Sequence, residues 1–188
     1  MLARHLRLNF WFYLLVLLTL GLGVMAGAMQ SPLTMEADDA SKLISQLTDS
    51  GSSLTLVGCL INQLPWWLSL SFLGLTVIGA LLILPVIFFK GYCIGYTIYT
   101  LARANGEAGI WFALTAVLPH NLVYIPCLLV MSVAAIRFTG VLFGVRDNKS
   151  GLLTSLFTYL VTVLLAGGGL VLGGVLECWV TPWLLHWW

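Results

Sequence analysis

Charged side chains are scarce in this sequence. Only 8% of its 188 residues are Asp, Glu, Lys or Arg, against about 25% in ordinary soluble domains. The formal net charge is +1, so the chain has no basic surface of the kind that binds nucleic acid. This composition argues against a water-soluble domain and against a nucleic-acid-binding protein.

The motifs of common catalytic and metal centres are also missing. The chain has no HExxH, no GxSxG, no P-loop and no spaced pair of aspartates. Its four cysteines show no CxxC spacing, which favours buried apolar thiols over metal or thiol chemistry. A disulfide between Cys59 and Cys178 stays open. The sequence predicts a protein that is not an enzyme and that carries no cofactor or metal.

Apolar residues, in contrast, are abundant: they make up 60% of the chain, and the mean hydropathy is +1.02. Long apolar runs occur at 10–29, 68–89, 121–136 with its extension, and 152–176, each near the length that crosses about 30 Å of hydrocarbon. The alternating short strands of a membrane barrel are absent from the sequence. The sequence predicts an all-α, polytopic membrane bundle of about five crossings, with residues 1–188 as a single domain.

The longest polar stretch is residues 30–64, predicted as an extracytoplasmic insert. Residues 57–64 repeat apolar side chains at i, i+3, i+4 and i+7, which indicates a short amphipathic helix. A second such helix is predicted earlier in the insert, and both would lie on the membrane surface. The insert is interpreted either as a partner-binding loop or as a solvated cap. Pro65-Trp66-Trp67 then predicts the return into lipid, because paired indoles favour the interface.

The stretch from Lys90 to Gly144 departs from a simple crossing. Lys90 is predicted at a helix end, where its ammonium can reach water. Residues 108–143 would be about 54 Å long as one helix, nearly twice the hydrocarbon thickness. This stretch carries the prolines Pro119 and Pro126, and the expected break is at Pro119 with Asn121. Residues 108–118 are therefore predicted as a half-helix and 121–143 as the crossing.

Pro119-His120-Asn121 is the most suggestive polar cluster. A helix broken at membrane depth frees backbone groups that need new partners, and His120 and Asn121 can supply them. The functional alternative is a polar cavity beside a half-helix, as in transporters. Glu177 follows the last crossing and is predicted in a hydrated outer position, although an inward fold would bring it to Arg103 or His120.

Glycine pairs at GxxxG spacing occur four times, at Gly23–Gly27, Gly91–Gly95, Gly140–Gly144 and Gly169–Gly173. Small residues at this spacing let two membrane helices approach closely. Because the chain has 19 glycines, one pair alone is a weak signal. Packing within the chain is favoured over a homodimer seam, and a homo-oligomer stays possible.

Positive charge predicts the orientation. With five crossings and a cytoplasmic N-terminus, most Lys and Arg residues fall on or near the cytoplasmic side, as membrane proteins prefer: Arg4, Arg7, Lys90, Arg137, Arg146 and Lys149 inside, against Lys42 and Arg103 outside. A multi-pass protein of the cell membrane is predicted, with its C-terminus extracytoplasmic.

Two blocks of this sequence resemble the stage II sporulation protein M family. KGYCIGYTIYTLARANG contains Lys-Gly-x3-Gly-Tyr-Thr, and AVLPHNLVYIPCLLVMSVAA contains Pro-His-Asn-x4-Pro. The block LECWVTPWL near the C-terminus also fits. Wider members of the family carry Pro-His-Gly followed by a glutamate, where this chain has Asn121 and Tyr124. The chain therefore resembles the sporulation branch, and any role of that glutamate does not transfer.

The resemblance implies a non-enzymatic membrane scaffold of the engulfment machinery. Such a scaffold helps to recruit the stage II sporulation proteins D and P to the septum, where they remodel peptidoglycan. The implied partners are these two proteins and membrane lipids. The alternative is a transporter or lipid conduit with a polar site at His120 and Asn121. The candidate motif residues are Lys90, Gly91, Gly95, Pro119, His120, Asn121, Pro126 and Glu177.

Overall fold

The computed structural model describes residues 10–30, 56–76, 78–104, 109–144, 151–180 and 183. The regular structure in these ranges is helical: α2 (Phe10–Gln30), α4 (Leu56–Leu75), α5 (Gly79–Ala104), α6 (Gly109–Leu142), α7 (Leu152–Val175) and the π-helical η3 (Leu176–Val180). Five helices within the described ranges are long and apolar enough to cross a membrane. The prediction of an all-α membrane bundle is confirmed.

The second and third crossings have other bounds than predicted. A turn at Thr76 ends α4, and α5 then starts at Gly79. The Thr76 N–H and hydroxyl both donate to the carbonyl of Leu73, at 3.0 and 2.8 Å, and the Gly79 N–H donates to the carbonyl of Thr76 at 3.1 Å. The predicted crossing at 68–89 is wrong, because this turn is built from apolar sequence and leaves no gap in the hydropathy.

The polar insert is shorter than predicted. Residues 57–64 form the first turns of α4 instead of a separate surface helix, and Pro65 lies inside α4. The remainder of the predicted insert, residues 31–55, lies outside the described residues.

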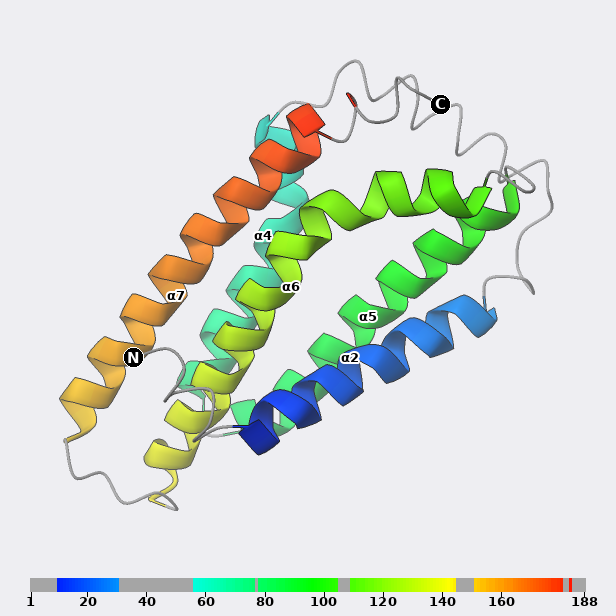
Figure 1. Cartoon of the computed structure of the whole chain (residues 1–188). Coiled ribbons are helices and arrows are strands. Elements are labelled where there is room, and N and C mark those ends of the chain that lie inside the picture. The colour runs from blue at the N-terminus through cyan, green and yellow to red at the C-terminus, as the bar shows by residue number, and fades with distance from the viewer. Residues whose placement is uncertain are drawn as a thin grey trace.

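The long helix α6 bends but does not break. Its 34 residues form one continuous helix with Pro119 and Pro126 inside it, so the predicted break at Pro119 is wrong. Figure 1 shows the first turns of α6 (green) running at an angle to its yellow-green remainder. A proline removes one backbone donor and bends the helix, while the other hydrogen bonds hold it together. The break was predicted because a straight helix of this length would exceed the hydrocarbon thickness. A bent helix need not run straight across the membrane, so no break is required.

The helices α2 and α5 run side by side (Figure 1). Gly23 and Gly27 lie so close to α5 that an added Cβ would overlap the carbonyl oxygens of Phe88 and Tyr92. Gly91 and Gly95 on α5 likewise lie against the backbone of α2. An added Cβ on them would overlap the carbonyl oxygens of Leu20 and Val24. Packing within the chain is thus confirmed for these two GxxxG pairs.

The other two GxxxG pairs differ from each other. An added Cβ would overlap Cys127 at Gly169 and the ring of Tyr124 at Gly173, so this pair packs α7 against α6. At Gly140 and Gly144, in contrast, an added Cβ would meet no atom within 4 Å among the described residues.

Helices α4, α6 and α7 pack around Tyr159, within one apolar core to which α2 and α5 also contribute. The ring of Tyr159 stacks on Phe138 at 5.1 Å between centroids, and its hydroxyl donates to the carbonyl of Ser71 at 2.7 Å. Large apolar side chains such as Leu122, Leu153 and Leu165 lie exposed on the outer faces, as expected where the solvent is lipid.

Candidate functional site: a buried polar cluster

Lys90 is a charged residue inside the bundle, with only 7% of its surface exposed. Because α5 starts at Gly79, Lys90 lies about 17 Å along a helix about 39 Å long. The predicted position at a helix end is therefore wrong: Lys90 lies near mid-membrane depth. A charge at that depth is costly and needs compensating partners.

Helix α4 supplies the partners of Lys90. The Lys90 ammonium donates a hydrogen bond to Oε1 of Gln63 at 2.9 Å, and Gln63 is itself only 6% exposed. The same ammonium lies 5.0 Å from the centre of the Trp66 ring, within the range of a cation–π contact. Trp66 thus faces into the bundle, where it solvates a buried charge, and does not serve as the interface marker predicted from sequence.

Glu177 brings a carboxylate to the same region from η3. Its Oε2 accepts a hydrogen bond from the Tyr124 hydroxyl at 3.3 Å, and its charge interacts electrostatically with Lys90. Glu177 is half-buried: it reaches Tyr124 while part of its surface stays exposed. Its hydrogen-bond partner is Tyr124, whereas the sequence suggested Arg103 or His120.

His120 and Asn121 form a hydrogen-bonded pair next to Tyr124. The Asn121 amide donates to the carbonyl of Val117 at 2.8 Å, and the same nitrogen lies 3.0 Å from His120 Nε2. A carbonyl only accepts, so the atom facing Val117 is the amide nitrogen. Its second hydrogen then points to Nε2, and the imidazole proton is placed on Nδ1. The ring of His120 meets that of Tyr124 edge-on at 5.8 Å.

One donor and one acceptor of this pair lack a hydrogen-bond partner among the described residues. His120 Nδ1 and Asn121 Oδ1 are buried and make no hydrogen bond to any residue that the structure describes. With the tautomer assigned above, the first of these atoms is a donor and the second an amide acceptor.

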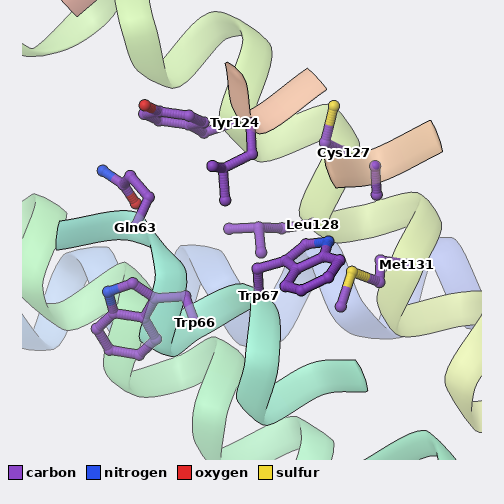
Figure 2. Close-up of a pocket in the computed structure, with 9 residues that line it drawn as sticks. Gln63, Trp66, Trp67, Tyr124, Cys127, Leu128 and Met131 are labelled. Carbon is purple, nitrogen blue, oxygen red and sulfur yellow. The ribbon is translucent and has the colours of Figure 1, made fainter. Parts of the chain in front are cut away.

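A small cavity adjoins the cluster. The centre of a water molecule can occupy a volume of about 20 Å³ in this cavity. That is enough room for about one water. Figure 2 shows the Trp67 indole beside Met131, with Gln63 and Tyr124 toward the other end. Trp67 donates through Nε1 to the carbonyl of Val163 at 3.2 Å, so this indole also lies inside the bundle.

The fold brings together four of the eight predicted motif residues: Lys90, His120, Asn121 and Glu177. Gly91 and Gly95 instead pack α5 on α2, and Pro119 and Pro126 lie within α6.

The sequence interpretation missed Gln63 and Trp66, and it noted Tyr124 without assigning it a role. The signal for Gln63 was an uncharged polar residue in an apolar stretch. It was assigned to a surface helix because the start of α4 was placed too late.

Removing the Tyr124 hydroxyl tests the contact with η3. Tyr124→Phe is expected to lower the free energy of unfolding by about 1 kcal/mol, measured by thermal unfolding in detergent. In a double-mutant cycle with Glu177→Ala, the two losses should be less than additive by a similar amount. Glu177→Gln keeps an acceptor for the hydroxyl and serves as the matched control. Fully additive losses would show that the two side chains do not interact.

The fold and the cluster define a multi-pass helical membrane protein with a buried polar site. Within the described residues, no three His, Cys, Asp or Glu side chains are grouped so that they could hold a metal ion. The chain belongs to the SpoIIM family, Stage II sporulation protein M, whose profile matches residues 11–182. It is thus a membrane protein of sporulation, as the sequence motifs indicated. No curated protein and no solved structure matches the chain.

Proposed function

We propose that this protein is a non-enzymatic scaffold that recruits and localises peptidoglycan-remodelling enzymes at the septal membrane during engulfment. Its partners in this proposal are the stage II sporulation proteins D and P. The observation that carries the proposal is membership of the Stage II sporulation protein M family over residues 11–182. The motif residues that indicate the sporulation branch, Asn121 and Tyr124, support it further.

The lipid-facing surface supports docking of a partner's membrane anchor. At Gly21 on α2, Gly140 on α6 and Gly168 on α7, an added Cβ would meet nothing within 4 Å among the described residues. Large apolar side chains, among them Leu164 and Leu165, surround such positions on the outside of the bundle. Small residues beside exposed apolar ones let a second helix approach closely.

The charge distribution supports a cytoplasmic N-terminus. With the bounds of α4 and α5 as described, Lys90 lies within a crossing and drops out of the comparison. Five of the remaining residues then lie on or near the N-terminal side and two on or near the other. They are Arg4, Arg7, Arg146, Lys149 and, in the last turns of α6, Arg137, against Lys42 and Arg103 at the end of α5. A cytoplasmic excess of Lys and Arg supports an extracytoplasmic position of η3, on the side where wall enzymes work.

Replacing residues 31–55 by a neutral linker of equal length tests the scaffold. Fluorescent fusions of the D and P proteins should lose their septal position, while thermal unfolding of the variant in detergent stays unchanged because α4 begins at Leu56. Affinity capture of the intact protein in mild detergent should recover both partners. Normal septal localisation of the D and P proteins in a strain that lacks this protein would contradict the proposal.

A transporter or lipid conduit is the second candidate, favoured by the unpaired His120 Nδ1 and Asn121 Oδ1 beside the buried charge of Lys90. Buried polar groups at membrane depth often mark a substrate path. Asn121→Leu separates the two functions: a conduit predicts failed sporulation with normal hydrolase localisation, whereas a scaffold predicts that sporulation and localisation fail together or not at all.

A further inference from the structure

Two thiols from distant parts of the chain face each other above the polar cluster. Cys59, three residues into α4, and Cys178, in η3, have their Sγ atoms 2.8 Å apart. Both cysteines are unbridged, and Cys59 is buried. Figure 1 places η3 (red) beside the first turns of α4 (cyan). The polar cluster uses neither thiol.

We propose that Cys59 and Cys178 form a reversible disulfide that fastens η3 to α4. A disulfide has an S–S length of about 2.05 Å, so the two sulfur atoms need to approach by less than about 1 Å. Both side chains are already in contact through their sulfur atoms. The other two cysteines, Cys93 and Cys127, are free thiols on α5 and α6.

The membrane topology places the two thiols on the same side. α4 begins after one crossing, and η3 forms the C-terminal end of the fifth candidate span, Leu152–Val180. The N-terminal end of α4 and η3 therefore lie at the same face of the membrane, whichever compartment that face meets. In the orientation proposed above, the face is extracytoplasmic, where disulfides persist.

The bridge would act on the polar cluster through Glu177, the residue next to Cys178. Glu177 accepts the hydrogen bond from Tyr124 and supplies a negative charge near Lys90. A covalent tie at Cys178 adds a link from η3 to α4 directly beside this carboxylate. The redox state of the pair thus sets how firmly the cluster is closed.

The oxidant is a disulfide donor, either an oxidised dithiol protein or a small disulfide. The Cys178 thiolate attacks one donor sulfur, the donor S–S bond breaks, and the first donor thiolate leaves. The Cys59 thiolate then attacks Cys178 Sγ in the mixed disulfide and expels the second donor thiolate. The two protons lost by the cysteines balance the two thiolates released, and the donor is reduced by two electrons.

Counting free thiols tests the proposal on the full chain in membranes. The membranes are incubated with an oxidised dithiol protein of the CxxC type, whose second thiol releases it again from any lone cysteine, so that lone thiols are not capped. They are then denatured in SDS and treated with a PEG-maleimide, which adds one mass step per free thiol. Because Cys59 and Cys178 are two of the chain's four cysteines, a bridged chain gains two steps and the same sample treated with a reductant gains four. Cys59→Ser should abolish this bridge-dependent difference of two steps.

The Cys93→Ser/Cys127→Ser variant is the matched control, because it keeps only the proposed pair. It should gain no step when oxidised and two when reduced. Reduction should also lower the midpoint of thermal unfolding of the wild type and leave that of Cys59→Ser unchanged. Two labelled thiols on the oxidised control variant, or its conversion to a covalent dimer in place of a bridged monomer, would overturn the proposal.

Discussion

Replacing Gln63 by leucine is expected to destabilise the bundle by about 3 kcal/mol or more. The change removes the oxygen that accepts the Lys90 hydrogen bond at 2.9 Å, and leucine offers no replacement. An ammonium left without its acceptor in a buried site costs far more than the net contribution of an ordinary hydrogen bond. Thermal unfolding in detergent, or unfolding by SDS titration in mixed micelles, measures the loss.

The double variant Gln63→Leu/Lys90→Met provides the control. It replaces both partners by apolar side chains of similar size, so neither the ammonium nor the amide is left unpaired. Glu177 loses its electrostatic contact with Lys90 and keeps the hydrogen bond from Tyr124. Its stability is expected within about 1 kcal/mol of the wild type, because apolar replacement of a buried polar pair is often neutral. If the double variant loses as much as Gln63→Leu alone, the harm comes from packing and not from the uncompensated charge.

The same double variant separates stability from function. A folded bundle without the Lys90–Gln63 pair that still supports sporulation assigns a structural role to the pair. A folded bundle that fails in sporulation assigns it a function. The buried position of both residues makes this distinction possible, because neither contributes to the outer surface on which a partner would dock.

The sequence predicted the first and last helices well because polar residues flank both. α2 and α7 start and end within a few residues of the predicted apolar runs. The boundary between α4 and α5 was not predictable from hydropathy, since the turn at Thr76 is satisfied by local backbone bonds to Leu73 and needs no polar loop. The error then placed Lys90 at a helix end.

The same error explains which site residues were missed. Once α4 starts at Leu56, Gln63 and Trp66 lie about two and about three turns inside a crossing and face α5. His120, Asn121 and Glu177 were found because polar groups in apolar sequence stand out by themselves. Which atoms they contact depends on the bend of α6 and on the position of η3, and neither has a signal in a single sequence.

Gly27→Ala is expected to have the other large effect, a loss of about 3 kcal/mol or more. The new methyl group would overlap the carbonyl oxygen of Tyr92 and approach the backbone of Tyr96. These atoms belong to the helix α5 itself and cannot move aside as a side chain can, so α2 must separate from α5. Overpacking against side chains typically costs about 1–3 kcal/mol, and contact with backbone lies at or above that range.

Gly21→Ala is the matched control on the same helix. An added Cβ at Gly21 meets nothing within 4 Å among the described residues, and alanine favours the helix over glycine by up to about 1 kcal/mol. The same chemical change is thus expected to leave the stability unchanged or to raise it. Equal losses for Gly21→Ala and Gly27→Ala would show that the cost is general to α2 and not due to its contact with α5.

Gly91→Ala probes the contact from the opposite side, because an added Cβ there would overlap the carbonyl oxygen of Leu20. Either change alone forces the two helices apart. The combination Gly27→Ala/Gly91→Ala should therefore lose clearly less than the sum of the single losses, since the second methyl enters space that the first has opened. Additive losses would instead mean that the two glycines pack independently, and that α2 and α5 tilt locally at each site without separating along their length.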